Sequence, residues 1–290
     1  MTRVADYFSL VRFSHSVFAL PFALCGAWLA AGGVPALHTL ALVVLCAVAA
    51  RTAAMAFNRL ADARIDARNP RTAQREIPAG RVGSRAASVL VLGSAALFVA
   101  GAWLLNPLAG WLALPVLGVL LGYSLMKRVH WSAHLVLGLA LALAPLGAWI
   151  AVRGVIDGSV APVLWLSAAV LTWVAGFDLI YACQDAQFDR ESGLHSIPAR
   201  FGVARALSLS AWLHAGTVLA LVRVGQSAGL SFIWWAALAL AGLLLLWEHR
   251  IVRPDDLSRV NMAFFTLNGW LGFLLFAGMV LDRWLLGAPA

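Results

Sequence analysis

Charged side chains are scarce in this chain of 290 residues, where Asp, Glu, Lys and Arg together make up 12% and hydrophobic residues 62%. In soluble domains about a quarter of the residues are charged, because much of their surface faces water. The mean hydropathy of +0.86 therefore excludes a soluble globular domain. We interpret the chain as an integral membrane protein.

Cysteine is nearly absent as well, with three residues spread over the chain, Cys25, Cys46 and Cys183. They form no CxxC pair and lie on or beside apolar segments, which excludes a disulfide framework and a cysteine-based metal site. Alternation of apolar and polar residues with a period of two is also missing, so the sequence does not predict a membrane β-barrel.

Long apolar runs, rich in Leu and Ala, make up most of the sequence. A helix needs about 20 residues to cross the roughly 30 Å of hydrocarbon in a bilayer. The nine runs of about that length are 15–33, 37–57, 86–105, 107–126, 132–152, 161–182, 204–223, 230–248 and 261–281. We predict an all-α, multi-pass membrane protein with nine transmembrane helices around a central cavity. We expect a single domain over residues 1–290, made of two similar halves, about 1–130 and 131–290.

Positive charge gathers in every second loop. Seventeen Lys and Arg residues fall in or beside five segments, whereas the intervening loops hold three, Arg153, Arg223 and Arg283. The five segments are 1–14, 58–85, 127–131, 183–203 and 249–260. Since positive charge marks the cytoplasmic side, we predict a cytoplasmic N-terminus and a location in the cell (inner) membrane. The net charge of +8 then reflects topology and contact with anionic membrane lipid, and we expect no nucleic-acid partner.

Two of these cytoplasmic segments carry carboxylates at helical spacing. The first is "FNRLADARIDARNPRTAQREIPAG", in which Asn58, Asp62 and Asp66 are four residues apart and share one helical face. The second is "FDLIYACQDAQFDRESGLHSIPARFG", residues 177–202. One helical face of this second segment carries Asp178, Tyr181, Asp185 and Asp189. Both segments lead to Ile-Pro-Ala, which indicates an internal duplication that places two half-sites around one cavity.

Carboxylates stacked in this way require a cation between them, which offsets their mutual repulsion. A single carboxylate at a membrane boundary is explained by solvation of a helix end, but carboxylates four residues apart repel and raise one another's pKa. Carboxylate and carboxamide oxygens suit Mg²⁺, which usually also binds substrate phosphates. We predict a cluster of two Mg²⁺ ions that bridges a diphosphate. Arg68, Arg71 and Arg75 follow the first stripe and suit phosphate oxygens. Taken alone, Arg68 and Arg71 are typical of a cytoplasmic anchor, whereas Arg75 is the exception, because it lies just before the Pro-containing turn that folds the loop back.

These segments resemble the two aspartate-rich motifs of the UbiA superfamily of intramembrane prenyltransferases. "NRLADARIDARNPRTAQREIPAG" is similar to the first motif, NxxxDxxxD, and "DLIYACQDAQFD" to the second, DxxYAxxDxxxD. "YSLMKR", residues 123–128, resembles the Tyr-and-Lys loop between the fourth and fifth helices of the family. The likeness is greatest to the 4-hydroxybenzoate polyprenyltransferases and their relatives in menaquinone synthesis.

The resemblance implies a role for each matching residue. The metal ligands would be Asn58, Asp62, Asp66, Asp185 and Asp189. Among the catalytic residues, Asp178 would bind the metal or support its ligands, and Tyr181 would lie near the allylic C–O bond that breaks. The diphosphate would be held by Lys127, Arg71, Arg75 and Tyr123. Arg51 would bind the carboxylate of the aromatic acceptor, which agrees with the high cost of an arginine inside a membrane helix.

Other residues carry weaker signals. Phe57, Tyr123, Phe177 and Tyr181 are candidates to line the path of an allylic cation through cation–π attraction, with ordinary helix packing as the alternative. His15 and His134 lie near predicted helix ends, and we interpret them as membrane-interface residues, with an approach to the acceptor as the alternative.

The expected function is Mg²⁺-dependent transfer of a polyprenyl group from polyprenyl diphosphate to a small aromatic acceptor of the 4-hydroxybenzoate type, in ubiquinone synthesis. The alternative acceptor is 1,4-dihydroxy-6-naphthoate, for menaquinone. A cation-coupled transporter would place its acids near the helix midpoints, and a phosphotransferase acting on CDP-alcohols would show a DGxxAR…GxxxDxxxD run, which is absent. The acceptor, the donor chain length and the oligomeric state stay open.

Overall fold

The computed structural model of the chain describes residues 4–11 and 18–286. In these two ranges the chain is helical, and its β-structure is limited to one isolated bridge between Arg253 and Asp256. The helices are α1 (Val4–Leu10), α2 (Leu20–Ala31), α3 (Leu37–Asp66), α4 (Ser84–Leu105), α5 (Pro107–Met126), α6 (Ala133–Arg153), η2 (Gly158–Val160), α7 (Ala161–Ala182), η3 (Cys183–Asp185), α8 (Ala186–Glu191), α9 (Ile197–Phe201), α10 (Val203–Ser227), α11 (Phe232–Ile251), η4 (Met262–Leu267) and α12 (Asn268–Leu286).

Eight helices of the described residues are long and apolar enough to cross a membrane, which confirms an all-α, multi-pass protein. They correspond to eight of the nine predicted runs, and α7 has the same bounds as its run, 161–182. The ninth run, 15–33, begins within residues 12–17, which lie outside the described residues, as does His15. Its described part is α2, of 12 residues, so the count of nine spanning helices stays a prediction.

The first acidic stripe is helical throughout. The predicted run 37–57 continues to Asp66, giving α3 30 residues and a length of about 45 Å, which exceeds the roughly 30 Å of hydrocarbon. Ala, Leu and Arg in residues 58–66 are strong helix formers, which explains the extension. The polar end of α3 therefore projects beyond the apolar layer.

The second acidic stripe is interrupted. We expected Asp178 and Asp189 to share one continuous helical face, but the 3₁₀ turn η3 separates α7 from α8. Such turns are frequent where α-helices end. Asp185 closes this turn and Asp189 lies on the short helix that follows.

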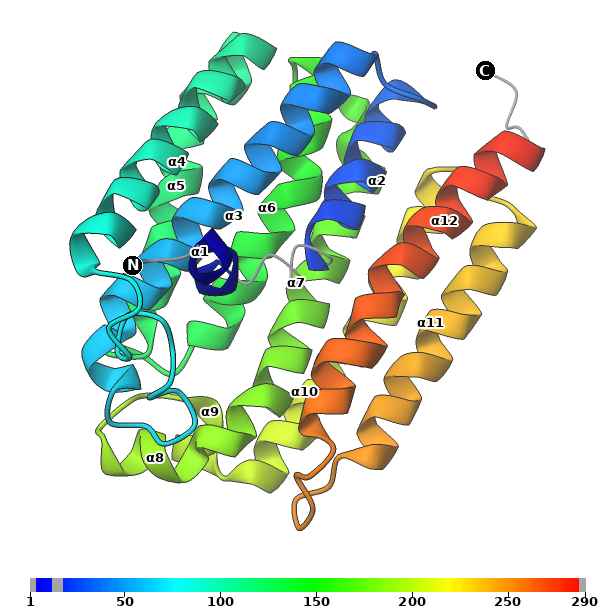
Figure 1. Cartoon of the computed structure of the whole chain (residues 1–290). Helices are drawn as coiled ribbons and strands as arrows, with labels where there is room; N and C mark the ends of the chain where they lie inside the picture. The colour runs from blue at the N-terminus through cyan, green and yellow to red at the C-terminus, as the bar shows by residue number, and fades with distance from the viewer. Residues whose placement is uncertain (1–3, 12–17, 287–290) are drawn as a thin grey trace.

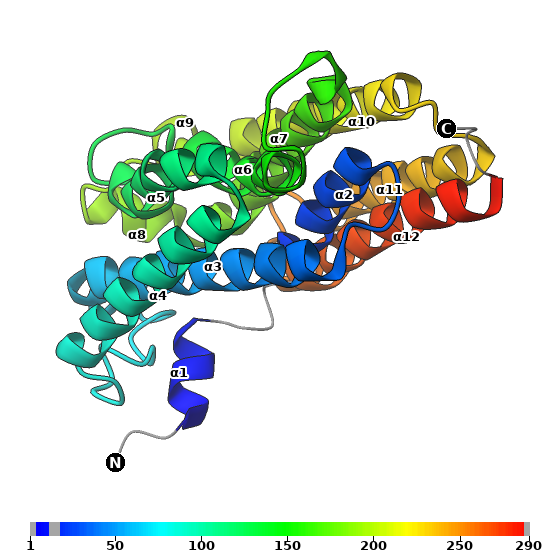
Figure 2. The ribbon, with the colours of Figure 1, turned by 90° about the horizontal axis from the view of Figure 1, so that it is seen from above.

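The long helices form one bundle, and the connections after α3, α7 and α11 meet at one end of it (Figure 1). Viewed along the bundle, α2 lies among α3, α6 and α12, and α1 lies outside (Figure 2); α2 contacts these three helices and α7. Large apolar side chains on α4 and α5, such as Leu92 and Trp111, are exposed, as expected for helices that face lipid.

Glycines let the inner helices approach closely. A Cβ at Gly26 of α2 would lie 2.1 Å from the carbonyl oxygen of Pro145 on α6, and one at Gly138 of α6 would lie 2.4 Å from the carbonyl oxygen of Leu171 on α7. Membrane helices rely on such small residues, because packing rather than a hydrophobic driving force holds them together.

We predict that Gly26→Ala destabilises the bundle by about 1–3 kcal/mol, because the added methyl group meets backbone atoms of Pro145. The midpoint of thermal unfolding in detergent should fall by several degrees. The control is Gly118→Ala on α5, where a Cβ meets no atom within 4 Å and Ala favours the helix. Equal midpoints for the two variants would contradict this packing account.

Candidate active site

A cavity of about 500 Å³ runs through the bundle. Side chains of α2 to α7 line it, together with residues of the loops and short helices at the polar end of the bundle. Both Val43 and Asp62 of α3 border it, and their separation of 19 residues along one helix corresponds to about 28 Å. The predicted central cavity is therefore present, and it spans most of the depth of a bilayer.

The deep part of the cavity is apolar. Its wall consists mainly of small or aliphatic side chains, among them Val43, Ala47, Leu105, Ala109, Ala144 and Ala148. The small side chains leave room for a long, flexible apolar ligand, and no charged group is among these wall residues. All of the predicted charged site residues lie nearer the other end.

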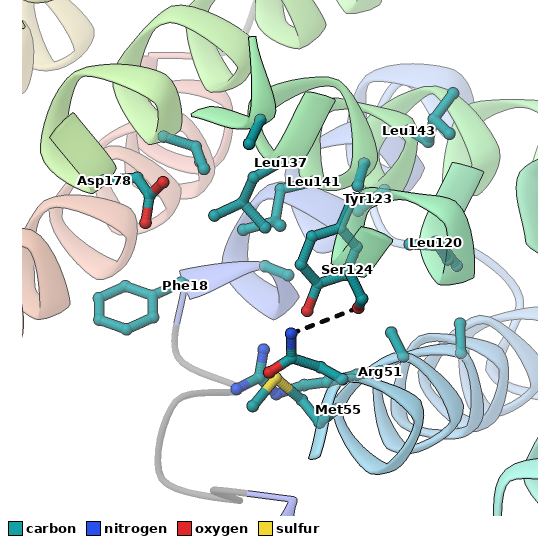
Figure 3. A pocket seen from close by; sticks show the side chains of 18 of the residues that line it. Phe18, Arg51, Met55, Leu120, Tyr123, Ser124, Leu137, Leu141, Leu143 and Asp178 are labelled. Carbon is teal, nitrogen blue, oxygen red and sulfur yellow. Dashed lines mark hydrogen bonds between the residues drawn. The ribbon is translucent and has the colours of Figure 1, made fainter. Parts of the chain in front are cut away.

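Asn58 and Asp62 border the polar end from α3. The Asn58 amide Nδ2 donates to Asp62 Oδ2 at 3.2 Å and to Ser124 Oγ of α5 at 3.3 Å; the dashed line in Figure 3 marks the bond to Ser124. Arg128 Nη2 donates to Asp62 Oδ1 at 3.2 Å. The carboxylate of Asp62 is thus held by both an amide and a guanidinium group.

The loop after α3 crosses to the second acidic segment. Asn69 Nδ2 donates to Asp185 Oδ1 at 3.0 Å. Arg71 Nε donates to the same oxygen at 2.9 Å and Nη2 to Asp185 Oδ2, so the pair is bidentate. Arg71 Nη1 also donates to the Tyr181 hydroxyl at 2.7 Å. The two motifs, 114 residues apart at Arg71 and Asp185, therefore form one site.

A second arginine of this loop binds the first motif. Arg75 Nη1 lies 2.7 and 2.8 Å from the two carboxylate oxygens of Asp66, which is buried. Arg71 and Arg75 both border the cavity. Arg68 is exposed and is not among the cavity residues. The structure thus brings two of the three predicted arginines to the site.

Lys127 is surrounded by carboxylates. Burial lowers the pKa of its ammonium group, but the negative charges of Asp189, Asp178, Asp185 and Asp62 raise it by more, so the pKa lies above its ordinary value. The only lysine of the chain is therefore charged at neutral pH and borders the cavity. A permanent cation at this place suits an anionic ligand.

The side chain of Asp178 is held by His134, which we interpreted from the sequence as a membrane-interface residue. His134 is fully buried, not exposed at the interface, because the start of α6 packs against α7. Its Nδ1 lies 2.6 Å from Asp178 Oδ2, and its Nε2 accepts the backbone N–H of Ile197 at 3.4 Å. Nδ1 therefore carries the hydrogen and donates a hydrogen bond to Asp178. A lone histidine at a helix start gives no sequence signal for this role.

Arg51 lies deeper in the cavity than the acidic groups, because it comes earlier on α3. It projects from α3 together with Met55 into the space that Asp178 and Tyr123 border (Figure 3). The phenol of Tyr123 is close enough for an electrostatic interaction with its guanidinium group. Arg51 and Tyr123 thus meet at the junction between the polar end and the apolar part of the cavity.

The aromatic predictions are met in part. Phe177, Tyr123 and Tyr181 border the cavity, whereas Phe57 packs in a cluster with α1 and α4 residues away from it. Phe57 directly precedes Asn58 on α3, but a step of one residue along a helix turns the side chain by about 100°, so the two side chains point in different directions. Phe264 also borders the cavity, and no sequence pattern singled it out.

The donor set fits a hard cation such as Mg²⁺. Asp189 is 2% exposed, and its Oδ2 has no hydrogen-bond partner, which is unusual for a buried carboxylate. In the described part of the chain, no three His, Cys, Asp or Glu side chains are close enough to share one ion; Asp62, Asp66 and Asp185 are instead paired with arginines. Oxygen-only ligands, with water completing the shell, are what Mg²⁺ prefers.

Comparison with known proteins shows the family of the chain. The model of the UbiA prenyltransferase family matches residues 19–277. The chain is 33% identical to the 4-hydroxybenzoate octaprenyltransferase of Paracidovorax citrulli, over 96% of this chain and 94% of the relative. It is 30% identical to the enzyme of the same name from Chromohalobacter salexigens, over 98% and 95% of the two chains.

Solved structures share the fold. The apo structure of a UbiA homologue from Aeropyrum pernix K1 superposes with a TM-score of 0.84 at 37% identity, covering 93% of this chain and 98% of the other. A UbiA homologue from Archaeoglobus fulgidus, bound to GPP and Mg²⁺, has a TM-score of 0.72 at 20% identity, over 94% and 99% of the two chains. With the family match over most of its length, the chain belongs to the UbiA prenyltransferase family and is a prenyltransferase.

Proposed function

We propose that the chain transfers a polyprenyl group from polyprenyl diphosphate to the ring of a small aromatic acid, in quinone synthesis. One observation carries the proposal: a single cavity, which extends about 28 Å along α3 from Val43 to Asp62, joins an end rich in Asp and Arg to an apolar part. A polyprenyl diphosphate has the same division, with a charged head and a long apolar tail. The tail is too apolar for water, which explains why the enzyme lies in the membrane.

The head of the donor would be bound by Lys127, Arg71, Arg75 and Tyr123. Guanidinium groups bind phosphate oxygens through two parallel hydrogen bonds. Arg71 already uses that geometry toward Asp185, whereas Arg75 donates from one nitrogen, Nη1, to both carboxylate oxygens of Asp66. To bind a phosphate group, each arginine would only need to exchange its carboxylate partner, and no helix would need to move.

The residues that would hold Mg²⁺, as two ions, are Asn58, Asp62, Asp66, Asp185 and Asp189. Bound Mg²⁺ would neutralise charge that develops on the diphosphate when it leaves. The buried unpaired oxygen of Asp189 supports this assignment, and the complex of a UbiA homologue of the same fold with GPP and Mg²⁺ is consistent with it.

The reaction begins when the allylic C–O bond ionises and its electron pair leaves with the diphosphate. Lys127 and the arginines stabilise the negative charge on this leaving group in a site shielded from water. Tyr181, hydrogen-bonded to Arg71, lies beside the head group. The allylic carbon then bonds to a ring carbon next to the phenol oxygen, and the ring loses a proton. His134 fixes Asp178 at the cavity wall, where the carboxylate faces the reacting groups.

The acceptor carboxylate would be bound by Arg51, with Tyr123 beside it. Both 4-hydroxybenzoate and 1,4-dihydroxy-6-naphthoate carry a carboxylate, so Arg51 suits either. The names of the relatives from Paracidovorax citrulli and Chromohalobacter salexigens favour 4-hydroxybenzoate. A cation-coupled transporter is disfavoured, because Asp62 and Asp66 lie at the end of α3 rather than near its midpoint.

We further propose that the polar end faces the cytoplasm, in the cell (inner) membrane. The seven arginines of residues 58–85 lie at this end, and positive charge marks the cytoplasmic side. The aromatic acceptor, which carries a charge, would then enter from the cytoplasm, and the donor from the lipid.

We predict that purified protein in lipid, given farnesyl or longer polyprenyl diphosphate and Mg²⁺, prenylates the ring of 4-hydroxybenzoate. 1,4-Dihydroxy-6-naphthoate is assayed in parallel. Asp62→Asn and Asp185→Asn should each lower the rate by at least about a hundred-fold, as expected when a ligand of the metal is removed. Product and released diphosphate are both measured, by mass spectrometry and a coupled phosphate assay.

Two variants control this assay. Asp256→Asn changes an exposed carboxylate in a loop at the same end, outside the cavity, and should leave the rate unchanged. Arg51→Leu should abolish ring prenylation while diphosphate release persists. Diphosphate release without any prenylated ring in the wild type would mean that the acceptor is wrong. No release at all would overturn the prenyltransferase site and favour the transporter.

Thiol labelling tests the orientation, because the three native cysteines are buried. We predict that Ser159→Cys, at the opposite end of the bundle, reacts with a membrane-impermeant maleimide in intact cells. Glu191→Cys, at the polar end, should react only after the cells are opened. Both positions are exposed. The reverse labelling pattern would place the site outside the cytoplasm.

A further inference from the structure

The last membrane helix begins with a π-helical turn. η4 (Met262–Leu267) directly precedes α12, and the backbone N–H of Asn268 donates to the carbonyl of Ala263, five residues back. Turns of this kind are rare, and many of them lie at functional sites. One extra residue in a turn shifts the register of the following side chains by about 100°. The turn therefore changes which residue of this segment faces the bundle interior.

The side chain of Asn268 holds the turn in place. Its Nδ2 donates to the carbonyl of Ala263 at 3.0 Å and to Glu248 Oε1 of α11 at 2.8 Å. Its Oδ1 accepts the indole N–H of Trp173 on α7 at 2.6 Å. Asn268, Glu248 and Trp173 are each 1% exposed. Because no water reaches these groups, the network has one favourable arrangement, which fixes η4 relative to α7 and α11.

Within this turn, Phe264 faces the cavity and Phe265 does not. The ring centroid of Phe264 lies 4.4 Å from that of Tyr181, 5.1 Å from that of Phe177 and 5.6 Å from that of Phe18. All four residues border the cavity, and we call them the aromatic wall. Figure 3 shows Phe18 and Asp178 among the side chains that line the cavity, and Asp178 belongs to the same helix as Phe177 and Tyr181.

The aromatic wall reaches the charged end. Tyr181 receives a hydrogen bond from Arg71, and the guanidinium carbon of Arg71 lies 5.0 Å from the Tyr181 ring centroid. Ring faces attract cations within about 6 Å. The wall therefore begins where the diphosphate would be bound and continues along the first part of the donor tail, which is where positive charge would develop after the C–O bond breaks.

We propose that Phe264 is a further catalytic residue, whose ring covers the allylic carbon, and that Asn268 is its positioning residue. The inference rests on the proposed function, since it needs an allylic cation in this cavity. That cation has two fates. It bonds to a ring carbon, which gives the prenylated acceptor and a proton, or to a water oxygen, which gives a prenol and a proton. By stabilising the cation and excluding water, Phe264 favours the first fate.

The test is the ratio of prenol to prenylated acceptor for each variant, in lipid with Mg²⁺ and farnesyl diphosphate. This ratio does not depend on how much folded enzyme is present, so a purely structural effect leaves it unchanged. Phe264→Leu, which keeps an apolar side chain without a ring, should raise the ratio about ten-fold, as expected for the loss of one cation–π contact. Phe273→Leu, which changes an exposed ring of α12 outside the cavity, is the control and should stay within about two-fold of the wild type.

Asn268→Leu tests the positioning. It removes the bonds to Ala263, Glu248 and Trp173 and should raise the ratio in the same direction as Phe264→Leu. Because both changes act through one ring, the double variant should show no larger ratio than Phe264→Leu alone. An unchanged ratio in Asn268→Leu, or multiplicative effects in the double variant, would overturn the role of Asn268.

Equal ratios in Phe264→Leu and Phe273→Leu would overturn the role of Phe264. Failure of the proposed function is a different result. It would show in the wild type, as the absence of any prenylated ring from either acceptor, whereas the inference is tested by the ratio of variant to wild type. A wild type that forms neither product would overturn both.

Discussion

The fold is organised by the need to neutralise carboxylates that are buried at one end of an apolar bundle. A buried charge without a partner is very costly, and Asp62, Asp66 and Asp185 each contact an arginine. Arg71 and Arg75 come from the loop after α3, so these ion pairs also join the end of α3 to that of α7. The same loop that compensates the charge thereby closes the polar end of the cavity. In the proposed reaction, the arginines would exchange carboxylate partners for phosphate oxygens and the carboxylates would bind metal instead. The charges would therefore stay balanced at every stage.

This arrangement connects the charged end to the apolar tunnel through a few side chains. Arg71 contacts both Asp185 and Tyr181, and Tyr181 packs on Phe264, which belongs to the turn that Asn268 holds. The head-group site and the wall where the cation would form are therefore in direct contact. In the proposed reaction, cleavage of the donor and protection of its cation from water would be performed by adjoining parts of one cavity.

Much of this was accessible from the sequence, because helix positions follow from the length of apolar runs and the shared faces of the acidic residues follow from helical spacing. α7 agrees with its predicted run, and the two acidic stripes meet as expected. The features that the sequence did not predict share one cause, since each depends on contacts between distant segments. Asn69 joins the site because its loop crosses to η3, His134 is buried because α6 packs on α7, and Phe264 faces the cavity because of a π-turn held from α7 and α11. No local pattern predicts any of these. The division into two similar halves stays a prediction.

The central claim is that the two acidic segments form a single site for a diphosphate and its metal. It is tested most directly by calorimetric titration of farnesyl S-thiolodiphosphate, which resists ionisation, into the protein in lipid nanodiscs. The comparison is between the wild type and Asp189→Asn, each with Mg²⁺ and with a chelator. The account predicts that chelation weakens binding to the wild type by at least about ten-fold and that Asp189→Asn binds weakly under both conditions. Equal wild-type affinity with and without Mg²⁺ would contradict it.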